Sequence, residues 1–372
     1  VVAKLDLLGP AFTAQAAAPG WRGFVRADSD GRHFRYDDGS FYYALGPCLR
    51  SPSDNRKPYA DPKWTAEMTE EIGTRGTYQY DEYLAAFQKA GINWTRVWLC
   101  SWWGGLQWRR DWPGYQGLGF YNLLNAWRMD HVLDEAERRG IRVGLCLTNH
   151  GQVSRVIDVE WPGNPLNSAL GGPLGSASEF FTRAAAKISH QNFLRYVTAR
   201  WGHSAAIMAW DLFSELEFTE EYRPSLAHWP SSDRPCPNID SWHTEMAAFL
   251  KELDPNRHLV GTHYSQPIRG AGTLALPAVE IATSNAYSAF DELAGGNYDA
   301  AAALDAFWNG CQFEGGLFTG FRVFRKPALV QEQGRHWMGV EWRGGRFVGN
   351  TRENLDADLH ASLWGSLVQP LA

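Results

Sequence analysis

The chain of 372 residues has 44% hydrophobic and 20% charged side chains, which excludes gross disorder and allows one large α/β barrel with decorations. Its formal net charge is -6 and it has no basic tract, so nucleic acid and anionic membranes are excluded as expected partners. We find no apolar run of about 18 residues that would span a membrane, and no signal peptide.

Residues 1–22 have the composition of a linker or of the remnant of an upstream module, and we assign residues 23–372 to one barrel domain. The first residues read like the tail of a removed segment, so a secreted or periplasmic location stays open. The five cysteines lack metal-type spacing. We expect Cys100 and Cys146 to be buried thiols, whereas Cys236 and Cys311 could pair.

The first regular elements are short and alternating. Segments around Phe24 and His33, with Asp38-Gly39 before Phe41, predict a β-hairpin that closes the bottom of a barrel. The segment from Phe41 to Leu45 is then the expected first barrel strand. Further along the chain, strands are expected at 92–99, 141–147, before Glu215, at 258–264, at 279–284 and before Glu332, and helices at 77–90, 119–139, 178–201, 239–253, 298–308 and 354–367.

Repeated βα units predict a parallel sheet with right-handed crossovers, and their number predicts a (β/α)8 TIM barrel. We count seven strands. The eighth strand should follow Pro370, but the chain stops at Ala372. A truncated sequence is the interpretation we favour. A second chain that completes the barrel, or a strand count that is wrong by one, are the alternatives.

Two strands are followed by glutamates that could carry chemistry. An apolar run from Ala206 ends in Ser214 and Glu215, and a second run from Pro327 ends in Glu332. Strands of a barrel deliver such groups to its carboxyl-terminal mouth. Retaining glycoside hydrolysis uses two carboxyl groups about 5–5.5 Å apart, and Glu215 and Glu332 could supply them. The alternatives are that Glu215 is one charge of an acidic loop, and that Glu332 is an ordinary loop acid with Glu341 as its rival.

The sequence resembles the clan A glycoside hydrolases, and the family 5-like cellulases and mannanases in particular. The resemblance covers roughly residues 23–372, and it is carried by these motifs in their order: Arg96, Trp210-Asp211-Leu212-Phe213-Ser214-Glu215, Tyr287 and Gln331-Glu332-Gln333-Gly334. It implies Glu215 as acid/base and Glu332 as nucleophile. It also implies that Arg96 keeps the nucleophile ionised and that Tyr287 hydrogen-bonds it.

Two positions depart from the family pattern. Ser214 stands where the family has the asparagine that contacts the sugar 2-hydroxyl, and Asn285 stands where it often has a histidine. Other substrate-binding candidates are residues in loops that follow strands: Asn149, His150, Trp102, Trp103, Trp108 and Trp337. Asn149 and His150 could equally be ordinary loop residues, and the tryptophans from Trp102 to Trp108 could simply pack beneath a long loop.

We therefore expect a retaining glycoside hydrolase that cleaves β-glycosidic bonds by double displacement, with a carbohydrate as its partner and without cofactor or metal. The alternative is a non-hydrolytic carbohydrate-binding protein on a degenerate barrel, which Ser214 and the missing strand favour. Transglycosylation by the same carboxylates is a third reading. The sugar, its linkage, exo or endo action and the oligomeric state stay open.

Overall fold

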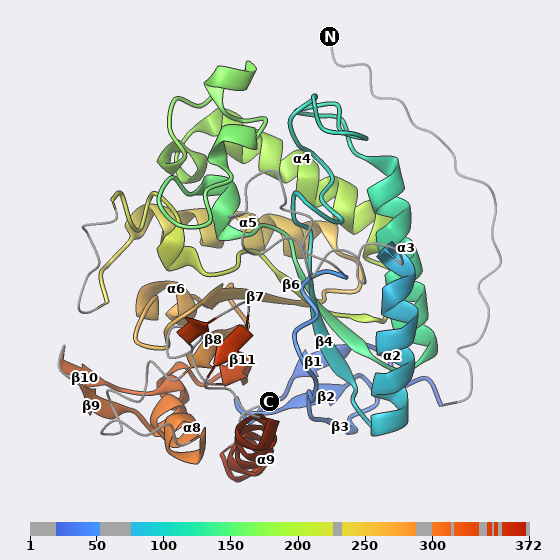
Figure 1. Cartoon of the computed structure of the whole chain (residues 1–372), viewed down its shortest axis with the longest axis vertical. Coiled ribbons are helices and arrows are strands. Elements are labelled where there is room, and N and C mark those ends of the chain that lie inside the picture. The colour runs from blue at the N-terminus through green and yellow to red at the C-terminus, as the bar shows by residue number, and fades with distance from the viewer. Residues whose placement is uncertain are drawn as a thin grey trace.

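The computed structural model describes residues 20–52, 76–225, 233–287, 300–313, 316–334, 341–343, 346–348 and 352–369 (Figure 1). Its strands are β1 (Val25–Ala27), β2 (Phe34–Tyr36), β3 (Phe41–Tyr42), β4 (Trp94–Trp98), β5 (Arg142–Cys146), β6 (Ile207–Asp211), β7 (Leu259–Tyr264), β8 (Ile281–Tyr287), β9 (Cys311–Phe313), β10 (Gly316–Phe318), β11 (Ala328–Gly334), β12 (Glu341–Arg343) and β13 (Arg346–Val348). The helices are α2 (Gln79–Ala90), α3 (Leu123–Arg138), α4 (Ala184–Trp201), α5 (Pro237–Leu253), α6 (Ala271–Ala275), α8 (Ala300–Asn309) and α9 (Arg352–Val368).

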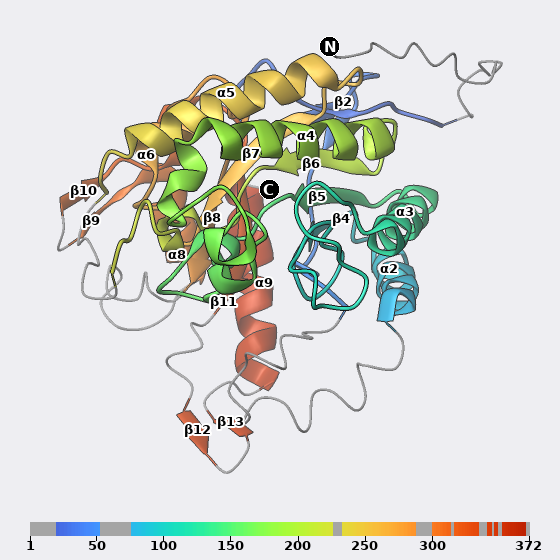
Figure 2. The ribbon, with the colours of Figure 1, turned by 90° about the horizontal axis from the view of Figure 1, so that it is seen from above.

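The centre of the fold is a six-stranded sheet in the order β11-β8-β7-β6-β5-β4, and every neighbouring pair in it is parallel. The connecting helices cover the outer side of this sheet, with α2 and α3 beside β4 and β5 and with α4 and α5 side by side along it (Figures 1 and 2). The sheet curls as part of a barrel. The expected α/β architecture of TIM-barrel type is therefore confirmed.

The expected first barrel strand differs from what the structure contains. Phe41 and Tyr42 pair with β2 in the small antiparallel sheet instead. The chain then runs beside β4, where Leu45 accepts hydrogen bonds from the N–H groups of Asn93 and Trp94, and Cys48 forms one parallel bridge to Arg96. The segment thus occupies the place of a first strand. Pro47 interrupts the ladder because proline has no N–H to donate, whereas Gly46 allows the close approach to β4, since a Cβ there would overlap the Trp94 carbonyl.

The small sheet β1-β2-β3 closes one end of the barrel, as the hairpin pattern predicts. Its inward side chains form a buried apolar cluster with residues in the first half of the barrel strands. That cluster comprises Val25, Phe34, Tyr36, Tyr42, Ala44, Trp94, Met208, Ala209, Leu259, Ile281 and Leu329. Because this sheet covers the amino-terminal ends of the strands, the carboxyl-terminal ends are left for a site.

Local signals in the sequence explain where the helices begin and end. Asn122 caps α3 by accepting a hydrogen bond from the Asn125 N–H, and Gly91 ends α2 in the left-handed conformation, at φ 75°. The strands β4 to β7 are buried along their whole length, which is typical of a parallel sheet that helices cover. The sequence pattern is therefore consistent with these helices and strands.

Three further expectations concern the described residues. Cys100 and Cys146 are buried thiols, and Cys236 and Cys311 are free rather than paired. Among the helices described, none combines the length and the apolar character that crossing a bilayer requires. Residues 1–19, most of the expected linker at 1–22, lie outside the described part of the chain.

Candidate active site

Polar side chains gather where the parallel strands end. Arg96 lies in β4, Asn149 and His150 follow β5, Ser214 and Glu215 follow β6, Asn285 lies in β8, and Glu332 lies in β11. The structure brings these sequence-predicted residues together at the carboxyl-terminal edge of the sheet. Tyr287 ends β8, but its side chain is outside the described part, as is the whole of Trp337.

Arg96 links two carboxylates inside the barrel. Its side chain is fully buried and donates to Asp211 Oδ2 through Nε at 3.0 Å and Nη2 at 2.6 Å. The remaining Nη1 donates to Glu332 Oε1 at 3.5 Å. Burial works to lower the pKa of Arg96, but Asp211 opposes it and the net shift is upward, so that the guanidinium stays charged. Arg96 therefore holds Glu332 beside a permanent positive charge.

Asp211 is the member of this group that the sequence reasoning missed. It lies within the motif that leads to Glu215, but it falls inside the strand and reads as part of a buried segment. Gln331 Nε2 also donates to its Oδ2, at 3.5 Å. The signal that could have found it was Arg96, because a cation in an apolar strand requires a buried partner.

Glu215 follows Ser214 and lies four residues after the end of β6. Its backbone is left-handed, at φ 50° and ψ 57°, a conformation that residues other than glycine seldom adopt. Burial raises the pKa of Glu215 to about 8. The charge of His150 opposes this shift, and the charges of Glu332 and Glu217 add to it. Glu215 is therefore protonated at neutral pH, which is the state that a general acid needs.

His150 lies between two carboxylates. Its Nε2 is 3.0 Å from Asp158 Oδ2, and its Nδ1 is 3.3 Å from Glu215 Oε2, a distance that suits an ion pair although the angles do not make a hydrogen bond. Burial alone would lower the pKa of His150, but Asp158 and Glu215 outweigh it and raise that pKa. Asp158, which the sequence did not point to, thus favours a cation next to the acid.

The segments after β5 and β6 lie side by side. Asn149 forms a parallel bridge with Ser214, whose N–H donates to the Thr148 carbonyl at 2.9 Å. Asn149 Nδ2 donates to Glu160 Oε1 at 2.6 Å, and this fixes the orientation of its amide. Asn149 Oδ1 and Ser214 Oγ are both buried without a hydrogen-bond partner in the protein. Two buried oxygens in the segments around Glu215 are therefore without a partner among the described residues.

The three tryptophans of the loop after β4 are buried. Trp102, Trp103 and Trp108 are only 7%, 3% and 3% exposed, and the first two belong to the main apolar core. Trp103 packs against Tyr80, and Gly163 lies so close to Trp108 that a Cβ there would overlap the indole. Little ring surface faces outward, so the structure favours packing beneath the loop over stacking on a sugar.

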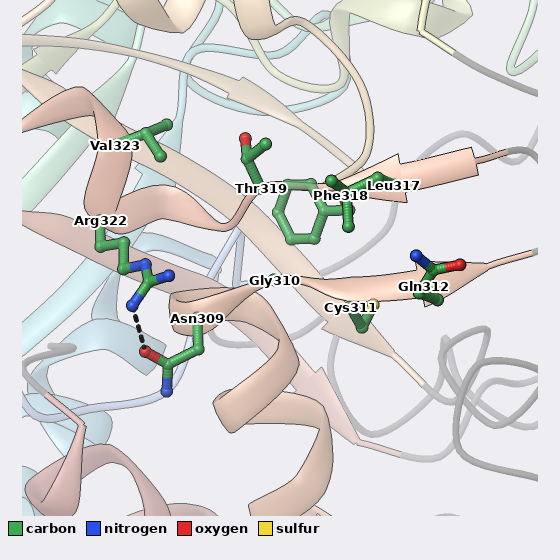
Figure 3. Close-up of a pocket in the computed structure, with 9 residues that line it drawn as sticks. All are labelled: Asn309, Gly310, Cys311, Gln312, Leu317, Phe318, Thr319, Arg322 and Val323. Carbon is green, nitrogen blue, oxygen red and sulfur yellow. Dashed lines mark hydrogen bonds between the residues drawn. The ribbon is translucent and has the colours of Figure 1, made fainter.

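The rival acid and one surface hollow lie elsewhere. Glu341 is in β12, which pairs only with β13 in a separate antiparallel sheet. A hollow of about 400 Å³ lies between the end of α8 and the β9-β10 hairpin, and its labelled lining side chains include no carboxylate (Figure 3). Arg322 donates to Asn309 Oδ1 there at 3.4 Å. The structure thus places Glu341 in another sheet than Glu215 and Glu332, and the described lining of the hollow brings no acid to it.

One group of side chains has the ligand types of a metal site. Ligand atoms of Asp81 on α2 and of His131 and Glu135 on α3 lie within 4.8 Å of one another. The carboxylate of Glu135 is already paired with Arg138 and Arg139, and His131 Nε2 lies 2.7 Å from Asp81. The group is explained as an ion-pair network between two outer helices.

The chain is similar in sequence to proteins of known activity. No family model matches the chain. It is 27% identical over 379 residues to mannan endo-1,4-β-mannosidase 1 of rice (Oryza sativa subsp. japonica), covering 94% of this chain and 76% of the rice protein. It is also 27% identical to rice mannan endo-1,4-β-mannosidase 3, where the match covers 74% of this chain and 59% of that protein.

Among solved structures, the glycoside hydrolase family 5 mannosidase from Rhizomucor miehei has a TM-score of 0.53 and 16% identity, covering 84% of this chain and 73% of that one. At this identity the match speaks for the fold alone. The relatives in sequence confirm the resemblance to the family 5-like glycoside hydrolases of clan A, and the solved structure agrees with it in fold. Enzymes of this class act on O-glycosyl bonds. The particular relatives that it matches in sequence are β-mannosidases of the endo type.

Proposed function

We propose that this chain is a retaining glycoside hydrolase that cleaves β-1,4-mannosidic bonds, with Glu332 as the nucleophile and Glu215 as the acid/base. One observation carries the proposal: two neighbouring carboxyl groups lie in opposite electrostatic environments. Burial raises the pKa of Glu215 to about 8, whereas Glu332 accepts a hydrogen bond from the buried guanidinium of Arg96. We therefore assign the carboxyl group with the raised pKa as the acid, and the one beside the guanidinium as the nucleophile.

The reaction follows from these protonation states. Glu215 donates its proton to the departing glycosidic oxygen while the Glu332 carboxylate attacks the anomeric carbon, which forms a covalent glycosyl-enzyme. Glu215 is then a carboxylate and takes a proton from the water that attacks the same carbon. The second attack frees Glu332 and restores the original anomeric configuration.

The supporting residues have defined tasks in this scheme. Arg96 donates a hydrogen bond to Glu332, and Tyr287 is proposed to donate another. Asn149 and Ser214 offer their unpartnered oxygens to hydroxyl groups of the sugar, in place of the single amide that the family has at the position of Ser214. His150 and Asn285 contact Glu215 rather than standing free for the substrate. Both act on the acid, and through it on the reaction.

The names of the relatives support mannan as the substrate. The chain spans 76% and 59% of the two rice proteins, so the activity of those proteins comes to this chain as a proposal. A non-hydrolytic carbohydrate-binding protein has no need of a buried acid whose pKa is raised to about 8, and the charges around Glu215 and Glu332 therefore favour hydrolysis.

The test begins with manno-oligosaccharides and β-1,4-mannan, with cello- and xylo-oligosaccharides as competitors. We expect cleavage of the mannan series, and proton NMR of the first product should show the β-anomer. Glu332→Ala should abolish hydrolysis, and added azide should restore turnover of an activated aryl glycoside and give an α-glycosyl azide.

Glu245→Ala, on the outer helix α5, is the matched control and should retain activity, since its carboxylate contacts Lys187 and Gln191 of the neighbouring helix α4. An α-anomer as the first product would exclude retention. Cleavage of cello-oligosaccharides alone would replace mannan by another β-glycan. If no β-glycan is cleaved but oligosaccharides bind, the binding-protein alternative takes the place of this proposal.

A further inference from the structure

Glu215, His263 and Asn285 form a closed ring of hydrogen bonds. The Glu215 N–H donates to His263 Nδ1 at 3.1 Å. His263 Nε2 lies 2.7 Å from Asn285 Oδ1, and Asn285 Nδ2 donates to Glu215 Oε1 at 3.3 Å. The ring therefore joins the backbone and the side chain of one residue through two others.

The direction of each bond in the ring is determined by the donors. A backbone N–H can only donate, so His263 Nδ1 must accept, and the hydrogen of the neutral imidazole is on Nε2. This N–H donates to Asn285 Oδ1, which leaves the amide nitrogen of Asn285 facing Glu215. A protonated imidazole would set two N–H groups against each other. Burial, with the charge of Arg96, holds the pKa of His263 well below its ordinary value, which agrees with the neutral form.

Both partners are held firmly. His263 comes from β7 and Asn285 from β8, and each is 0% exposed. Rigid strands position a side chain more precisely than loops do. The ring also holds Glu215 in its left-handed backbone conformation, which costs free energy that the surrounding contacts must offset.

We propose that His263 is a positioning residue for the acid/base: acting through the ring, it fixes the orientation of the Glu215 carboxyl group. Oε1 is held by the hydrogen bond that it accepts from Asn285 Nδ2. Oε2 is the oxygen that faces His150 Nδ1, at 3.3 Å. The inference rests on the proposed function, since it says how the acid of that reaction is aimed.

The departure from the family at Asn285 gains an explanation from this arrangement. An amide has a donor and an acceptor on one short side chain, so it can join His263 to Glu215. His263 and Asn285 are therefore coupled, and neither should act without the other. A purely structural contact would not require such coupling, so the double variant distinguishes the two cases.

The experiment compares His263→Phe, Asn285→Leu and the double variant on two substrates, a manno-oligosaccharide and its 2,4-dinitrophenyl glycoside. The natural leaving group needs protonation and the dinitrophenolate does not. We expect kcat/KM for the oligosaccharide to fall about 30- to 100-fold in each single variant, because misplacing a general acid removes much of its contribution. For the dinitrophenyl glycoside the change should stay below about threefold, and the double variant should resemble the single ones.

His243→Phe is the matched control, since His243 is also a buried histidine with a lowered pKa, about 4, and it contacts Thr262 of β7 but not the ring. It should leave the ratio of the two rates unchanged. Equal losses on both substrates, or losses that multiply in the double variant, would overturn the role of His263. If His263→Phe does not fold, Asn285→Leu and a His263→Gln variant decide between the same two results. A wild-type protein inactive on both substrates would instead refute the proposed function itself.

Discussion

Arg96 is anchored on Asp211, to which it donates two hydrogen bonds of 3.0 Å and 2.6 Å. Both groups are almost fully buried, with side-chain exposures of 0% and 3%. The pair leaves one nitrogen of the guanidinium for Glu332, at a longer 3.5 Å. The cation that serves the nucleophile is thus held in place by a carboxylate from a different strand.

The first prediction concerns this anchor. Asp211→Asn leaves the buried charge of Arg96 without its counterion, and removing one partner of a buried pair costs about 3–5 kcal/mol. We expect a loss of stability of that size in denaturant unfolding. Activity should fall as well, because Arg96 is then free to move away from Glu332. Glu245→Gln breaks the ion pair of Glu245 with Lys187, in which the side chains are 41% and 21% exposed, and should cost less than about 1 kcal/mol. A stable and fully active Asp211→Asn variant would contradict the anchoring role.

The second prediction concerns stability against pH. The pKa of Glu215 is raised from 4.5 to about 8, so between these values the folded protein binds a proton that the unfolded chain has lost. The contribution of this group to stability is therefore complete below about pH 4.5 and is lost as the pH rises toward 8. Glu215→Gln has no such loss. We expect its melting temperature to exceed that of the wild type by a margin that grows from pH 5 to pH 8, and a margin independent of pH would refute the shifted pKa.

The third prediction concerns His150. The cation on His150 lowers the pKa of Glu215, against the larger effect of burial. His150→Gln removes that charge, so the pKa of Glu215 should rise further. The alkaline limb of kcat/KM, which in the wild type falls as pH rises through about 8, should move to higher pH. Asp158→Asn should act in the same direction more weakly, since Asp158 raises the pKa of His150. A limb that moves to lower pH would show that His150 does not act on Glu215 as a cation.

Much of the fold could be predicted from the sequence, and the reasons are local. The helix expected at 77–90 is α2, Gln79–Ala90, because its apolar period and Gly91 both mark it. The strand expected at 258–264 is β7, Leu259–Tyr264. The prediction of the first barrel strand was wrong. The apolar pattern of Phe41 to Leu45 suits any strand, and the pairing partner decides which sheet a strand joins. The sequence also could not decide whether Trp102 and its neighbours are buried, since aromatic residues occur both in apolar cores and in sugar-binding sites.

The sequence by itself determined the order of the strands and which of them carry Arg96 and Glu332 or lead to Glu215, because periodicity and turn residues act over a few residues. Only the tertiary structure decided that Arg96 pairs with Asp211, that Asp158 holds a cation beside the acid, and that His263 and Asn285 close a ring on Glu215. These contacts join different strands and loops, and the protonation states follow from burial and from charges that the fold brings together.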